Sequence, residues 1–150
     1  MLHHRHAIHS AFLAALLGLG ASCAVAQTSA SSSAMTTRLS GESEVPPVVT
    51  GGRGSFEANL NRQANVLSWT LTYSGLSGPV TAAHFHGPAM PGENAGVALP
   101  LSGSLASPMS GTAALTPAQA ADLIAGKWYV NLHTAANPNG EIRGQLKIVP

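Results

Sequence analysis

Cross-linking residues and charge are both scarce in this sequence. One cysteine, Cys23, stands among 150 residues, and charged side chains make up 9% of the chain. A single cysteine cannot close an internal disulfide, so the fold has to be stabilised by packing. The apolar run from Ala11 to Leu19 falls short of the about 20 residues that a membrane-spanning helix needs, and no later stretch approaches that length. The sequence therefore predicts no membrane span.

Residues 1–26 have the pattern of a secretory signal peptide. A basic start at Arg5 precedes the apolar run, and residues 24–26 (Ala-Val-Ala) form a small-x-small cleavage site. Lipid modification of Cys23 is the alternative, which the absence of Leu at position 20 disfavours. We expect a periplasmic or secreted protein. The four histidines before the apolar run belong to the leader in this interpretation and are not counted as a metal site.

Charge in the exported part is balanced. Without Arg5 it has six basic and six acidic side chains. Nucleic acids and anionic membrane surfaces attract clustered positive charge, so neither is an expected partner. Residues 27–34, rich in Ser, Ala and Thr, are predicted to be a flexible spacer, and residues 35–150 to form one domain.

Short segments rich in β-branched and aromatic residues alternate with Gly, Pro and Asn along this domain, a pattern typical of sandwiches and barrels. We predict an all-β fold, a Greek-key β-sandwich or barrel of about eight strands with one short helix. The strands are expected at residues 36–40, 54–61, 66–73, 80–86, 96–101, 109–115, 128–133 and 141–149.

Two local signals place the helix and a hairpin. Thr116 as N-cap, Pro117 at the first helical position and Gln119 three residues after the cap predict a helix start, and Gly126 predicts its end. The Asn-Gly pair within residues 137–140 tolerates positive φ and is predicted to join the last two strands as a hairpin.

The histidines of the exported part lie in two strand segments. Successive side chains of a strand point to opposite faces, so a core position for Phe85 puts His84 and His86 together on the other face, about 7 Å apart along the strand. By the same alternation His133 also points away from the core. If the two strands are close in space, the three imidazoles are expected to bind one metal ion.

Three neutral imidazoles with an open position suit copper or zinc, and the two histidine segments contain no soft sulfur ligand. Copper is favoured over zinc, because an all-imidazole set holds Cu(I) with three ligands and Cu(II) with added water. The predicted hairpin also places Glu141 or Arg143 beside His133. Glu93 and Asn94, in the loop from Gly87 to Gly96, are candidates for a lid or for groups that support the ligands.

The two histidine segments resemble a known family. Residues 82–89 (AAHFHGPA), 129–134 (YVNLHT) and 137–146 (NPNGEIRGQL), with the earlier 39–47 (LSGESEVPP), are similar to the CHRD domain named after chordin. The resemblance covers residues 36–147. It implies an exported module of the kind found in bacterial exported proteins and in chordin, and it leaves the biochemical role open.

A weaker resemblance is to copper–zinc superoxide dismutases, which are Greek-key β proteins with a His-x-His strand and a later copper-binding histidine. It implies copper at His84, His86 and His133, and it gives Arg143 the role of attracting and orienting superoxide, which suits a permanently charged guanidinium. The sequence lacks the fourth copper histidine, the zinc ligands and the cysteine pair of those enzymes. Only a copper-only dismutase is compatible with these counts.

Two further interpretations stay open. The resemblance to chordin suggests a non-catalytic extracellular module that binds an unidentified protein, through the polar sheet face or through the loop at residues 87–96. A zinc hydrolase with three histidine ligands would need a general base, for which only Glu93 and Glu141 are available.

Overall fold

The computed structural model describes residues 31–149. The predicted signal peptide lies outside these residues. The described elements, in chain order, are β1 (Ser32–Ser40), the 3-10 helix η1 (Gly41–Ser43), β2 (Arg53–Asn61), β3 (Val66–Ser74), β4 (Val80–His86), β5 (Val97–Pro100), β6 (Met109–Ala114), α1 (Pro117–Ile124), β7 (Tyr129–Thr134), β8 (Ile142–Gln145) and β9 (Lys147–Ile148).

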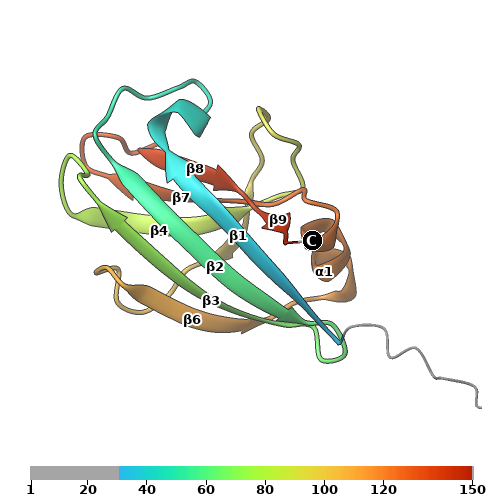
Figure 1. Ribbon diagram of the computed structural model, residues 1–150. Coiled ribbons are helices and arrows are strands. Elements are labelled where there is room, and N and C mark those ends of the chain that lie inside the picture. Colours follow the sequence, from blue (N-terminus) through green and yellow to red (C-terminus); the bar gives the residue numbers. More distant parts are fainter. Residues whose placement is uncertain (1–30, 150) are drawn as a thin grey trace, which may run out of the picture.

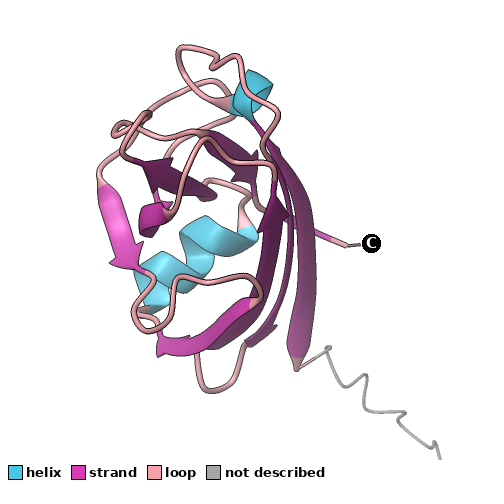
Figure 2. Cartoon of the chain, turned by 90° about the vertical axis from the view of Figure 1, so that its left-hand side faces the viewer, coloured by secondary structure: helices cyan, strands magenta, loops and turns pink. Residues whose placement is uncertain are grey.

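The strands form one curled antiparallel sheet in the order β5-β4-β7-β8-β1-β2-β3-β6, with β9 paired to β1. The sheet bends into a half-barrel, so that β4 and β7 lie behind β2 and β3 (Figure 1). Figure 2 shows α1 between the two halves of the sheet, at the open side of the half-barrel. The predicted all-β architecture of about eight strands with one short helix is confirmed.

Aromatic side chains fill the space between the two halves. Phe85 on β4 meets Phe56 on β2 and Trp69 on β3, with ring centroids 5.6 and 5.3 Å apart and both pairs edge-to-face. These contacts join opposite walls of the half-barrel, and Phe85 and Phe56 are completely buried. The predicted core position of Phe85 is therefore confirmed, which fixes the outward direction of its neighbours His84 and His86.

Helix α1 starts and ends as its sequence predicts. The Thr116 hydroxyl accepts a hydrogen bond from the backbone N–H of Gln119, and the Gln119 side chain accepts one from the backbone N–H of Thr116. Gly126, with φ of +72°, follows the C-cap residue. Leu123 and Ala120 are buried against the sheet, so the helix closes the open side of the core.

Two strand boundaries differ from the prediction. β1 begins at Ser32, because Ser32 to Ala34 pair with β2, and the three residues do not belong to a spacer. The last predicted strand, 141–149, is broken: Leu146 donates its backbone N–H to Trp128, after which β9 pairs with β1. This break turns the chain, and Ile148, which alternation along an unbroken strand 141–149 would put on the core face with Ile142, is 38% exposed.

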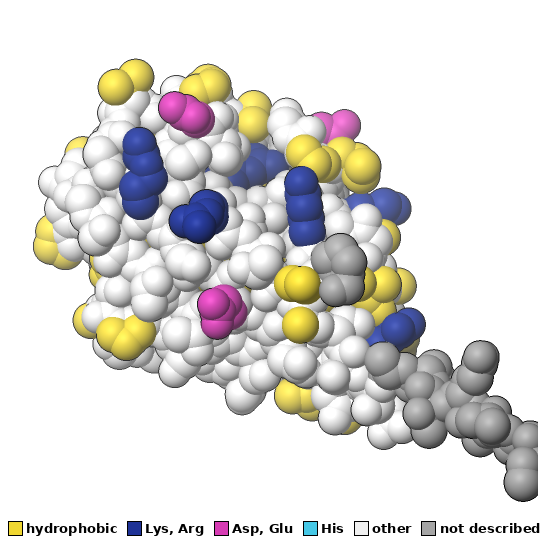
Figure 3. Space-filling view, in the orientation of Figure 1, with side chains coloured by type: hydrophobic (Ala, Val, Ile, Leu, Met, Phe, Trp, Pro, Cys, Tyr) yellow, Lys and Arg dark blue, Asp and Glu magenta, His cyan; other side chains and the backbone are white. Residues whose placement is uncertain are grey.

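The outward faces of the two sheet halves differ in cover. On β2 and β3, apolar buried residues alternate with exposed polar ones, as expected for a sheet with one face in water. Figure 3 looks onto the β1–β2 side, where charged side chains are scattered and no histidine is visible among the described residues. In contrast, all six residues of β7 are buried, so both of its faces are covered.

Two loops cover the outward face of β7, the face that points away from the core. The loop at residues 87–96 and the segment after η1 meet where the Asn94 side chain donates a hydrogen bond to the Val45 carbonyl. Together they lie over the outward side of β4, β7 and β8, and the polar residues there are enclosed instead of solvated. The histidine segments belong to this covered face.

Candidate metal centre

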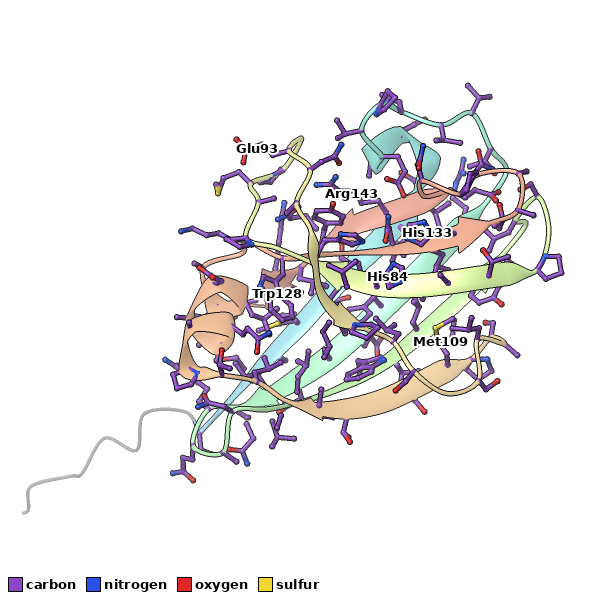
Figure 4. The ribbon with its side chains drawn as sticks, turned by 180° about the vertical axis from the view of Figure 1, so that it is seen from behind. His84, Glu93, Met109, Trp128, His133 and Arg143 are labelled. Atoms are coloured by element: carbon purple, nitrogen blue, oxygen red, sulfur yellow. The ribbon has the colours of Figure 1, made fainter. Side chains whose placement is uncertain are left out.

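The two histidine-bearing strands are direct neighbours. β4 pairs antiparallel with β7, with Ala82 opposite His133 and His84 opposite Asn131. This register places the side chains of His84 and His133 diagonally on one face, and Figure 4 shows them next to each other on adjacent strands. Their nearest nitrogens, Nδ1 of His84 and Nε2 of His133, are 3.1 Å apart. The sequence-based condition that the strands be close is met.

His86 completes the group. One ring nitrogen from each of His84, His86 and His133 lies within 4.8 Å of the other two. Two nitrogens bound to one ion at about 2.0–2.1 Å are at most about 4.2 Å apart, so the spacing of the three nitrogens is close to what one ion requires. His133 is 8% exposed and His86 9%, while His84 is half-buried.

Backbone carbonyls hold two of the three rings. Nδ1 of His86 is 2.9 Å from the Ala95 carbonyl oxygen, and Nδ1 of His133 is 3.0 Å from the Pro138 carbonyl oxygen. A carbonyl only accepts, so each Nδ1 carries the proton and each Nε2 of the neutral ring has a free lone pair. Nε2 of His86 is buried without any hydrogen-bond partner. Metal-binding histidines are oriented in this way in many proteins.

The surroundings favour neutral imidazoles. Burial, and then the neighbouring histidines, lower the pKa of His84. Burial also lowers the pKa of His133, against the effect of its hydrogen bond to Pro138. Because the neutral ring is the form that binds metal ions, the cluster is prepared for a cation at neutral pH.

Arg143 lies behind the cluster. Its guanidinium carbon is 3.4 Å from the centre of the Tyr129 ring, and the His86 ring stacks on Tyr129 at 4.8 Å with an interplanar angle of 3°. β7 lies between β4 and β8, so Tyr129 separates Arg143 from His86. Arg143 is 1% exposed, and its guanidinium donates hydrogen bonds to the Glu93 carbonyl and to the Asn94 side chain.

The other predicted neighbours take different positions. Glu141 is completely buried but binds hydroxyl groups of Thr50, Ser77 and Thr134, and no hydrogen bond joins it to a histidine in the described part. Glu93 caps its own loop, where its carboxylate accepts the backbone N–H of Met90. The group of this loop that touches the cluster is the carbonyl of Ala95.

Two residues of the centre carried too weak a sequence signal to be singled out. Asn131, 3% exposed, places its side-chain oxygen 3.0 Å from Nε2 of His133. Glu44, 6% exposed, comes from the segment after η1, and burial raises its pKa to about 7, against the charge of Arg143 and the Asn131 amide. Asn131 lies two residues before His133 on the same strand and so points to the same outward face, which was the one sequence signal for it. Glu44 reaches the site only through the tertiary fold.

A small cavity opens beside the histidines. It has a volume of about 420 Å³, and its lining includes His86, Tyr129, Asn131 and Glu44. A molecule of a few atoms can therefore approach the cluster from this side.

The features together describe an antiparallel half-barrel with an enclosed three-histidine centre on its outer face. A family model for the CHRD domain matches residues 35–146, and the chain belongs to this family. No curated protein and no solved structure matched the chain, so the comparisons lend no support to the resemblance to superoxide dismutases. CHRD domains are modules of extracellular proteins. No helix within residues 31–149 is long and apolar enough to cross a membrane.

Proposed function

We propose that this CHRD domain binds one copper ion through His84, His86 and His133 and works as an exported copper protein. The observation that carries the proposal is the convergence of three neutral imidazoles, one of which has a buried nitrogen without a hydrogen-bond partner. Copper held there would supply one-electron exchange with a small substrate such as superoxide.

The donor set supports a borderline transition metal. Three imidazole nitrogens suit copper and zinc, and no thiolate or carboxylate competes within the cluster. The hydrogen bonds from His86 and His133 to backbone carbonyls orient the rings without adding charge. A neutral ligand set leaves the positive charge of the ion uncompensated, and such a centre attracts small anions.

The role of Arg143 as an anion guide stays a prediction. Because Tyr129 lies between the guanidinium and His86, the arginine acts on the centre through its charge and through the loop that it holds. We assign it a positioning role in addition: it fixes the segment that carries Ala95, whose carbonyl orients His86.

The test is a titration of protein comprising residues 27–150 with Cu(II) and, under reducing conditions, with Cu(I). We expect one copper per chain in the wild type and none in the His84→Ala, His86→Ala double variant. A matched control is the Ser68→Ala, Thr70→Ala double variant, which changes two exposed residues on the open face of β3 with the same spacing. Equal copper content in the wild type and the histidine variant contradicts the proposal.

Superoxide dismutation is tested on the same copper-loaded samples. Activity that disappears with the two histidines supports a copper-only dismutase. Copper binding without dismutation leaves a copper-binding module, and the absence of both leaves the alternative of a protein-interaction domain. That alternative predicts partner binding that is indifferent to chelators.

A further inference from the structure

We propose that the side-chain oxygen of Asn131 is a fourth donor of the metal centre, so that the complete set is three imidazole nitrogens and one amide oxygen. The inference rests on the proposed function, because it assigns a ligand to the same ion. It also adds a selectivity that the three histidines alone do not provide, namely a preference for Cu(II) over Cu(I).

The first argument is a conflict of lone pairs. Oδ1 of Asn131 is 3.0 Å from Nε2 of His133, a hydrogen-bonding distance. Nε2 has no proton to offer, however, because the proton of the neutral ring is on Nδ1, toward the Pro138 carbonyl. Two acceptors that face each other at this distance repel, unless a cation binds both.

The second argument is the orientation of the Asn131 amide. Gly140 has φ of +126°, and a Cβ on this residue would collide with Oε1 of Glu44 and lie 2.7 Å from Nδ2 of Asn131. The amide nitrogen of Asn131 and the carboxylate of Glu44 therefore border the same small space. The Asn131 side chain hydrogen-bonds the Glu44 carboxyl group, and an amide donates through its NH₂ end, so Nδ2 faces Glu44 and Oδ1 faces His133.

The third argument is burial. Asn131 is 3% exposed, and its neighbour in the cluster, Nε2 of His86, has no hydrogen-bond partner. Buried polar atoms are normally satisfied, so a buried imidazole nitrogen without a partner, beside the facing pair of Asn131 Oδ1 and His133 Nε2, indicates a missing cation. Nε2 of His133 is also 3.1 Å from Nδ1 of His84, so the amide oxygen and the histidines converge on the same nitrogen.

An amide oxygen changes which copper state is preferred. Oxygen is a harder donor than imidazole nitrogen, and hard donors favour the divalent ion. The proposal therefore gives Asn131 a specificity-determining role: its oxygen stabilises Cu(II), while Cu(I) is held by the three nitrogens. The reduction potential of the centre then depends on a residue that is not a histidine.

The experiment compares wild-type protein with Asn131→Leu, which has a similar shape and no donor. We expect the variant to bind Cu(II) about 10- to 100-fold more weakly, the range found for groups that support metal ligands, and to retain its Cu(I) affinity. Each tenfold selective loss raises the one-electron potential by about 59 mV. The electron paramagnetic resonance spectrum of the Cu(II) protein should also change. Identical spectra and equal Cu(II) affinities overturn the inference.

The two hypotheses fail separately in this experiment. If wild-type protein binds no copper, both the proposed function and the fourth donor are wrong. If the wild type binds copper through its histidines and Asn131→Leu leaves affinity and spectrum unchanged, only the fourth donor is wrong. Circular dichroism of the metal-free variants checks that they are folded.

A second variant keeps the test valid if Asn131→Leu does not fold. The pair Asn131→Asp, Glu44→Gln exchanges the carboxylate and the amide and so preserves a hydrogen bond between the two positions. The carboxylate oxygen at position 131 should tighten Cu(II) binding and shift its spectrum relative to the wild type. An unchanged affinity and spectrum in this double variant overturn the inference as well.

Discussion

The outward face of the sheet is exposed to solvent on β2 and β3 and covered by loops on β4, β7 and β8. The outward residues of β2 and β3 are small or charged polar side chains in water, whereas those of β4, β7 and β8 are polar side chains under loops. Strand alternation alone produces both faces. The difference lies in the segments after η1 and after β4, which enclose one face and leave the other open.

The loops enclose the polar residues of the covered face and bring them together as a candidate site. On the open face, the polar side chains are exposed to solvent, and neighbouring side chains have little effect on one another. Under the loops, His86, Asn131 and Glu44 have to be satisfied by protein groups, and some of their atoms are not. Their unmatched acceptors are the physical basis of the proposed metal centre.

The largest expected effect of a single substitution is at Arg143. Arg143→Met removes the charge beside Glu44 and both hydrogen bonds to the loop, and we expect a loss of about 3–5 kcal/mol in the free energy of unfolding, as for other broken buried pairs. Arg38→Met, at an exposed position on β1, is the control and should change stability by less than about 0.5 kcal/mol. Urea denaturation measures both. Equal effects would show that the covered face is not special.

Glu141 should make the protein sensitive to acid. Burial alone would raise the pKa of this carboxyl, but hydrogen bonds from Ser77, Thr134 and Thr50 outweigh it and lower the pKa to about 2. Because the folded-state pKa lies below the unfolded value of 4.5, the carboxylate stabilises the fold above that pH, and the stabilisation is lost as the pH falls from about 4.5 to about 2.

Glu141→Gln tests this dependence. At pH 7 we expect the variant to be less stable by about 2 kcal/mol, since bonds from hydroxyl groups to a charged acceptor are lost. Below pH 4 the difference from the wild type should shrink. Thermal denaturation from pH 2 to pH 7 measures it, and a difference that does not depend on pH would disprove the role of the carboxylate.

Glu44 should have the opposite pH dependence in a different window. Its pKa, raised to about 7 by burial, exceeds the unfolded value of 4.5, so the folded protein binds more protons between these values and metal-free protein loses stability as the pH rises through them. Glu44→Gln should remove this slope and stabilise metal-free protein at pH 8 by about 1–2 kcal/mol. A slope unchanged in the variant would contradict an ionisable, enclosed Glu44.

The smallest expected effect is on the open face. Ser68→Ala and Thr70→Ala on β3 replace exposed side chains, and each should change the free energy of unfolding by less than about 0.5 kcal/mol. Copper affinity should be unchanged. A large effect of either substitution on metal binding would mean that the two faces are coupled through the core, contrary to the comparison.

Much of the fold was predictable because it depends on local patterns. Alternation placed Phe85 inside and His84 outside, and the capping box of Thr116 with Gln119 fixed the start of the helix. The break at Leu146 was not predictable, because it depends on a hydrogen bond to Trp128, a residue distant in sequence. Alternation along an unbroken strand therefore gives the wrong face for Ile148.

For the candidate site, the three histidines were easier to predict than the residues that surround them. Parity predicted the outward direction of all three histidines, whereas the pairing of β4 with β7, which brings His133 to the other two, was left as a condition that the structure meets. The position of Arg143 behind Tyr129, and the approach of Glu44, depend on how loops fold over the sheet. No periodicity in the sequence encodes that cover, so Glu44 and the carbonyl of Ala95 were not predicted.

The most direct test of the three-histidine centre is a crystal structure of residues 27–150 grown with copper, with anomalous diffraction measured at the copper edge. The account predicts one anomalous peak within about 2 Å of a nitrogen of each of His84, His86 and His133. A peak at any other position, or none at full copper loading, would contradict it.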